Sequence, residues 1–188
     1  MQSGTGFEIR TIFGALVVAT AMAVITAGPA GAVDDTTTTT FTVSAGALGI
    51  NAPATAPLGT GAAGGTITAQ MGNVVVTDAR AQLAPTWAAT VASGDFTTGT
   101  ATTDETIAND LVGYWSGPAI SPSGSGATFV PGQPTAGDVV TLAASRPAFS
   151  LTAGVGNNSV TWNPTLIVNV PAAAVAGGYT GTVTHSVV

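Results

Sequence analysis

The stretch LIVNVPAAAVAGGYTGTVTHSVV, residues 166–188, decides the fold class. It opens with an apolar run of β formers that stops at Pro171, because proline cannot donate a hydrogen bond to a strand ladder. A glycine pair then precedes a second run, in which apolar residues alternate with threonine. Alternation with a period of two is typical of a strand that buries one face. The stretch therefore predicts two strands, 166–170 and 179–187, with the odd-numbered residues of the second facing inward.

Similar runs of β formers recur through the chain and end at glycine, proline, asparagine or aspartate. The other candidate strands are 39–45, 66–71, 74–79, 86–91, 111–115, 127–130, 139–143, 148–152 and 159–162. The Gly/Asn cluster at 154–158 is interpreted as a tight turn, and the Ser/Gly stretch at 121–126 as a flexible surface loop. Because tight turns join antiparallel strands, we predict an all-β fold. Its form is an antiparallel β-sandwich of immunoglobulin-like size or slightly larger over residues 41–188, with a closed barrel as the alternative.

The beginning of the chain has the pattern of a secretory signal. Residues 11–27, TIFGALVVATAMAVITA, carry no charge, follow an arginine and precede a Gly-Pro break. Small residues at 30–32 are suited to a signal peptidase, so we expect residues 1–32 to be removed. An uncleaved membrane anchor is the alternative, because the uncharged run is long enough to cross a bilayer. In either case the folded part is expected outside the cell, and after cleavage no membrane contact is expected.

The composition of the 188-residue chain excludes several classes of protein. Three basic residues against nine acidic ones give a net charge of -6, so no positive surface is available for nucleic acid. The absence of cysteine excludes disulfide scaffolds and zinc sites built on thiolates. Only 6% of the residues are charged, which favours neutral β structure with hydroxyl-rich faces.

Residues 33–40 are predicted to be a flexible lead-in. They contain five consecutive threonines, Thr36 to Thr40, which have β propensity but no apolar face. Such a run alone cannot offset the entropy cost of ordering its backbone. Its hydroxyls are candidate O-glycosylation sites.

The titratable residues favour structural roles, and we predict no catalytic residue, no metal site and no cofactor. His185 is the only histidine, and no GxSxG elbow accompanies it, so a partly buried strand histidine is expected. The acids near residues 104–110 lack the alternating pattern of a calcium loop and are expected in a solvated loop. Asp78 and Arg80 lie two residues apart on one side of a strand, which predicts a salt bridge.

Four aromatic residues are the candidate ligand-binding residues. Exposed rings stack on the apolar faces of sugars, whereas buried rings fill a sandwich core. We expect Trp87 and Trp162 in the core, and Tyr114 and Trp115 as the more exposed pair. Alternation sends Tyr114 and Trp115 to opposite faces of their strand.

Three stretches together resemble the WxL domain of Gram-positive surface proteins. They are VVVTDAR at 74–80 with Thr86-Trp87, SVTWNPTL at 159–166, and the run from Val170-Pro171 to Thr184. In that family a VxDxR-type strand leads into a first Trp, and a TPTL then VPAGTxAGxYxxTxTW run carries the second. The resemblance begins near residue 66 and extends to residue 188.

The two signature tripeptides differ from the WxL pattern. The first reads Trp87-Ala88-Ala89, and the second reads His185-Ser186-Val187, with histidine in the place of tryptophan. The resemblance implies a β-rich extracellular domain associated non-covalently with the peptidoglycan envelope, often beside other surface proteins.

These observations predict a secreted, non-enzymatic bacterial cell-surface protein that binds wall glycan or peptidoglycan through exposed aromatic rings. The alternative is a structural subunit whose edge strands pair with neighbouring copies, giving homo-oligomeric fibres or arrays. Low charge and the absence of lysine remove a common guard against edge pairing. A hydrolase is a third and weaker hypothesis.

Overall fold

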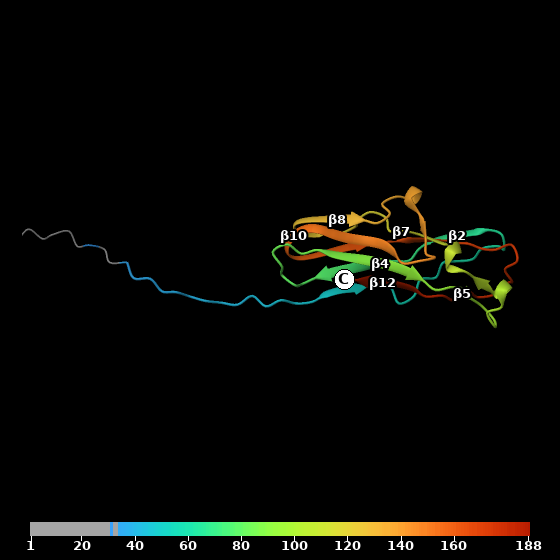
Figure 1. Ribbon diagram of the computed structural model, residues 1–188, viewed down its shortest axis with the longest axis horizontal. Helices are drawn as coiled ribbons and strands as arrows, with labels where there is room; N and C mark the ends of the chain where they lie inside the picture. Colours follow the sequence, from blue (N-terminus) through green and yellow to red (C-terminus); the bar gives the residue numbers. More distant parts are fainter. Residues whose placement is uncertain (1–30, 32–33) are drawn as a thin grey trace, which may run out of the picture. The chain divides into compact units, whose positions relative to one another are not determined.

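The computed structural model describes residue 31 and residues 34–188 (Figure 1). The predicted signal segment and its cleavage site fall on residues outside this part of the chain. Residues Thr42–Val188 form one compact unit, built almost entirely from antiparallel strands. The predicted all-β, sandwich-like fold class is therefore confirmed.

The larger sheet is assembled around one long strand. Its six members are β1 (Leu48–Asn51), β3 (Val74–Asp78), β4 (Trp87–Ser93), β8 (Ser123–Pro131), β10 (Arg146–Trp162) and β12 (Val183–Val187). They follow the order β1-β3-β10-β4-β12, and β8 also pairs with β10. Strands β1 and β12 lie close to each other, so this sheet is nearly closed.

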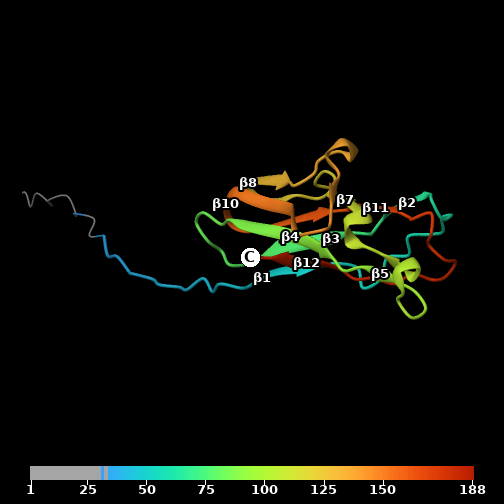
Figure 2. The same ribbon diagram turned by 45° about the vertical axis from the view of Figure 1, so that its right-hand side comes forward.

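The second sheet contains four strands in the order β2-β11-β7-β9, three of which are labelled in Figure 2. They are β2 (Thr66–Gln70), β7 (Val112–Trp115), β9 (Val140–Thr141) and β11 (Thr165–Asn169). A short ribbon and three 3-10 turns complete the unit: β5 (Phe96–Thr97), β6 (Thr106–Ile107), η1 (Thr103–Glu105), η2 (Asn109–Leu111) and η3 (Ala136–Asp138). Every strand pair is antiparallel, as the tight turns predicted.

Strand β10 corrects two of the sequence-based predictions. The expected strands 148–152 and 159–162 belong to this single strand, and the expected turn at 154–158 is a bend within it. The register of the β8 pairing shifts three times between Leu151 and Asn158, as expected where glycine and asparagine form bulges. The predicted loop at 121–126 is also wrong, because β8 begins at Ser123 and its serine and glycine residues pair with β10.

Two further expectations differ from the structure. Residues 39–45 form no strand, and all of residues 34–47 are exposed; no strand in the described part of the chain pairs with residues 39–45. The strand predicted at 179–187 begins only at Val183. Its alternation is nevertheless as expected, with the odd-numbered residues half-buried and the even-numbered ones exposed.

The core lies between the inner faces of the two sheets. Strand β3 illustrates the period of two, because Val74 and Val76 are fully buried. Two of its largest buried side chains, Phe149 and Trp162 of β10, stack on each other with ring centroids 4.9 Å apart. Apolar burial is the main stabilising term here, since few charges are available.

Candidate functional site

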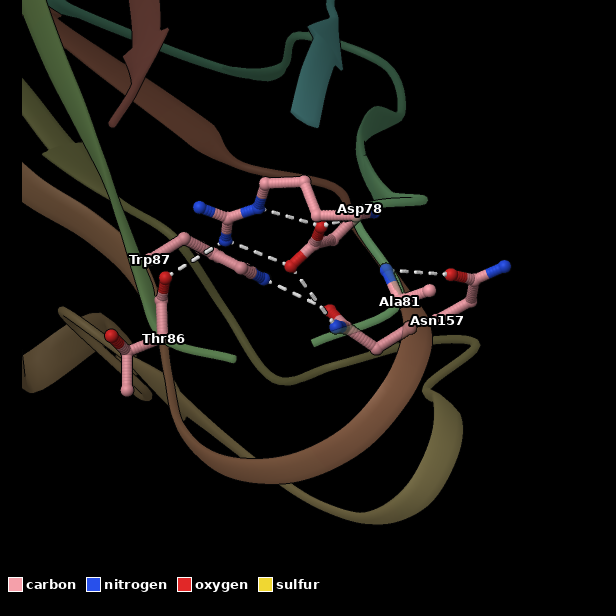
Figure 3. A network of polar contacts seen from close by, with 7 residues as sticks. Asp78, Ala81, Thr86, Trp87 and Asn157 are labelled. Carbon is pink, nitrogen blue, oxygen red and sulfur yellow. Dashed lines mark hydrogen bonds and ion pairs between the residues drawn. The ribbon is translucent and has the colours of Figure 1, made fainter. Parts of the chain in front are cut away.

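A buried polar network joins the ends of β3 and β4 to β10 (Figure 3). Asp78, the last residue of β3, has a fully buried side chain. The Nε atom of Arg80 donates to its Oδ1 at 2.8 Å, and a terminal nitrogen donates to Oδ2 at 2.9 Å. The predicted salt bridge is thus confirmed as a bidentate pair. Hydrogen bonds from Arg80 lower the pKa of Asp78 below its ordinary value and keep it ionised.

Asn158 of β10 extends the network to the first tryptophan. It lies opposite Asp78 in the ladder, and its Nδ2 donates to the Asp78 carboxylate at 3.3 Å. Its Oδ1 accepts the indole N–H of Trp87 at 2.9 Å. The amide therefore satisfies one buried donor and one buried acceptor, each costly to leave unpaired.

Arg80 also closes the segment between β3 and β4. Its guanidinium donates to the carbonyl of Thr86 at 2.9 Å, just before β4 begins. Within the same segment, the amide of Ala81 donates to Oδ1 of Asn157 at 3.1 Å (Figure 3). These contacts attach the segment to the bend of β10.

A second cluster of buried aromatic residues connects the two sheets. Trp162 Nε1 donates to the Tyr114 hydroxyl at 3.2 Å, and this hydroxyl lies 3.2 Å from Nε2 of His185. Because the phenol accepts from the indole, its proton is free to be donated to His185. Burial raises the pKa of Tyr114 above its ordinary value, so the phenol stays protonated.

His185 occupies an unusual position for a titratable group. Burial lowers its pKa to about 4, so the ring is neutral at physiological pH. Its Nδ1 is buried and has no hydrogen-bond partner among the described residues. The expectation of a partly buried strand histidine is confirmed.

The structure separates the four candidate ligand-binding residues by burial. Trp162 and Tyr114 are 0% exposed and Trp87 is 3% exposed, so none of these three presents a ring face to solvent. The expected burial of Trp87 and Trp162 is confirmed, whereas the expected exposure of Tyr114 is wrong. Strand β7 has both neighbours in place, and Tyr114 points into the core. Trp115 lies on the opposite face and is only half-buried.

One end of the sandwich carries a hollow of about 1300 Å³ that sequence reasoning missed. Its lining comes from residues 53–63, the ends of β2 and β11, β5, and the segment 174–183. No charged side chain is among the lining residues. The floor includes Ile67 and Leu166 of the second sheet and Phe96 of the short ribbon. No local motif could have revealed it, because the segments that line it are far apart in the sequence.

The loops beside this hollow are braced by hydroxyl and carboxylate contacts. The phenol of Tyr179 donates to the carbonyl oxygen of Val175 at 2.9 Å and so closes the turn that precedes β12. The carboxylate of Glu105 accepts hydrogen bonds from the hydroxyls of Thr100 and Thr102, each at 2.9 Å. Hydrogen bonds from Thr102 are the main cause of the lowered pKa of Glu105.

Across residue 31 and residues 34–188, no three His, Asp or Glu side chains gather in a way that would hold a metal ion. In the same part of the chain, no helix has the length and apolar character needed to span a membrane.

No family model, curated protein or solved structure matches the chain. The resemblance to the WxL domain therefore stays a prediction. The structure places both signature-like positions in the interior: Trp87 in the Asp78 network and His185 beside Tyr114 and Trp162.

Replacement of the buried carboxylate is expected to destabilise the fold. Asp78→Asn leaves Arg80 without its charge partner, and we expect the free energy of unfolding to fall by about 2 to 3 kcal/mol. Urea denaturation followed by tryptophan fluorescence measures the change. The exposed Asp110→Asn is the matched control and should change stability little. An equal loss in the two variants would contradict the role assigned to Asp78.

Stability should also fall in mild acid because of His185. The unfolded chain takes up a proton near pH 6.5, whereas the folded chain does so only at about 4, so protonation favours unfolding across this window. The full shift corresponds to about 3 kcal/mol, present above pH 6.5 and lost as the pH falls to 4. Stability measured against pH should flatten over this window in His185→Gln. The stability contributed by Asp78 is lost only below its ordinary pKa of 3.8. Asp78 therefore does not affect the pH dependence of stability between pH 4 and 6.5.

Proposed function

We propose that this chain is a non-enzymatic bacterial cell-surface protein that associates non-covalently with wall glycan, and that the glycan lies in the end hollow. The observation that carries the proposal is the uncharged lining of a hollow of about 1300 Å³. A site of this size is larger than most small-molecule pockets and suits an extended oligomer.

The chemistry of the lining matches that of a sugar chain. Pyranose rings have apolar C–H faces and hydroxyl edges. Leu58, Ile67 and Phe96, which are half-buried, supply an apolar floor, and the exposed hydroxyls of Thr180 and Thr182 supply hydrogen-bonding groups beside it. Backbone groups of the Ala/Gly/Pro-rich segment 53–63 add further donors and acceptors. The binding mode originally expected, stacking on Tyr114, Trp87 or Trp162, is not supported because these rings are buried.

The charge of the protein favours a neutral ligand. With a net charge of -6, the chain repels anionic wall polymers and gains nothing from phosphate groups. The uncharged segment at 11–27 and the resemblance to WxL domains both favour the extracellular location on which the proposal depends. The same resemblance favours peptidoglycan, or other surface proteins beside it, as the partner.

A substitution at Gly178 tests the hollow. A Cβ atom at this lining residue would meet no atom within 4 Å, so Gly178→Glu should fold normally while placing bulk and charge in the site. We expect retention on purified peptidoglycan to fall by about tenfold, which corresponds to 1.4 kcal/mol. Gly49→Glu is the matched control, because Gly49 is equally open, lies on β1 away from the hollow and receives the same charge.

Trp115→Ala and the salt dependence complete the test. If the hollow binds the glycan, Trp115→Ala should leave retention unchanged, since Trp115 is not among the lining residues. Retention should also be insensitive to salt, because no ion pair is formed. Loss of retention in Trp115→Ala alone would move the site to β7. Absence of retention in the unmodified protein would refute wall association.

A further inference from the structure

The outer edge of β8 has no partner strand in the part of the chain that the structure describes. Strand β8 spans nine residues, Ser123–Pro131, and pairs only with β10. It contains no charged residue, and its one proline is the last residue. Gly124 and Gly126 have positive φ and lie where the pairing with β10 is bulged, so the regular part of the free edge is 127–131. An uncharged edge of this kind can accept another strand, because its outward N–H and C=O groups are unpaired.

The inner face of β8 is also incompletely covered. Ala127 and Phe129 pack against the core, and Phe129 lies 6.0 Å from Trp87 between ring centroids, yet both residues remain partly exposed. On the other face Val130 is 44% exposed. One more strand beside β8 would extend both faces and bury this apolar surface.

The segment at 36–43, TTTTTFTV, has the properties of such a strand. It consists of β formers, carries no charge and is exposed along its whole length. Phe41 is 90% exposed and Val43 is 74% exposed, so the segment has apolar side chains that a partner strand could cover. With a period of two, these residues share one face and the even-numbered threonines share the other.

The segment cannot place Phe41 and Val43 on the edge of β8 in its own copy. The amide of Gly46 is bonded to the carbonyl of Ala79 at 2.7 Å, so the chain is held beside the end of β3. From there Phe41 is at most about 18 Å away and Val43 at most about 11 Å, because a fully extended chain spans at most about 3.6 Å per residue.

The edge of β8 lies farther away than this. Leu48 pairs with Asp78, Asp78 with Asn158 and Asn158 with Gly124, so β1, β3, β10 and β8 lie side by side. A strand added outside β8 is four spacings from β1, about 19 Å along the sheet. The route through β12, β4 and β10 is longer by one strand. The segment of a second copy is not limited in this way, because it is not joined to the sheet that it contacts.

We propose that residues 36–43 of one copy add as a strand to the free edge of β8 in a second copy. Phe41 and Val43 then lie beside Ala127 and Phe129, and threonines of the segment lie beside Thr128 and Val130. The contact is head to tail, because the donor and the acceptor are different surfaces. Repetition therefore passes from copy to copy, and it closes into a ring or continues as an open chain according to the rotation between neighbours. This assembly is independent of wall binding.

Disulfide trapping tests the contact directly, since the natural chain contains no cysteine. The full chain with Thr40→Cys and Thr128→Cys, or with Ser125→Cys as the acceptor for a shifted register, should form a ladder of covalent multimers on mild oxidation. Thr40→Cys with Thr68→Cys is the matched control, because Thr68 is an exposed threonine on β2, also a strand with one paired neighbour.

A proline within the segment 36–43 distinguishes strand addition from random collision of the two cysteines. Thr38→Pro removes one backbone donor from an exposed segment, so it leaves the sandwich folded. It should lower the yield of the ladder by about tenfold, the equivalent of one lost hydrogen bond.

The proposal fails if the unmodified chain sediments as a monomer at every concentration and no ladder forms. It also fails if Thr68→Cys traps multimers as well as Thr128→Cys does. Retention on peptidoglycan should be the same in Thr38→Pro, so failure of assembly and failure of wall binding are distinguishable.

Discussion

The fold depends on the ionised carboxylate of Asp78 being fully paired inside the sandwich. A buried charge is tolerated only where hydrogen bonds and an opposite charge replace water. Here Arg80 supplies two side-chain donors and one backbone donor, and Asn158 supplies another. The four-residue arrangement with Trp87 brings together the end of β3, the start of β4 and the bend of β10. These are the places where the chain leaves and re-enters the ladder, so their polar groups would otherwise be unpaired.

The second buried cluster likewise pairs polar side-chain atoms inside the core. Trp162, Tyr114 and His185 come from β10, β7 and β12, and their polar atoms contact one another across the interior. Trp87 and His185, the two positions at which the sequence resembles the WxL signatures, therefore both face inward. In this chain their side chains contribute to packing and polar pairing between strands rather than to an exposed surface.

Much of the strand pattern was predictable, because alternation and apolar runs directly reflect burial. Strands β2, β3, β4, β7 and β11 were placed within two residues of their ends for this reason. The Asp78–Arg80 pair was also predictable, since the spacing alone brings the two side chains together. The first half of β8 could not be predicted, because serine and glycine carry no periodic signal. This part of the strand forms only through its pairing with β10.

Less of the site than of the fold could be predicted from the sequence. A side chain's burial depends on which strands lie on either side, so the sequence could not show that Tyr114 points inward and Trp115 outward. The role of Asn158 was hidden as well, since the turn-like sequence around it suggested a loop. Likewise, the hollow is formed by segments separated by more than a hundred residues, and only the assembled sheets bring them together.

The chain enters and leaves the sandwich at the same end. Figure 2 shows the label of the C-terminus beside β1, whereas β2 and β5, which border the hollow, lie at the opposite end. Anything joined to either end of this unit would thus be held on the side remote from the hollow. Such polarity leaves the hollow free to meet its proposed ligand, whatever is joined to the chain at the other pole.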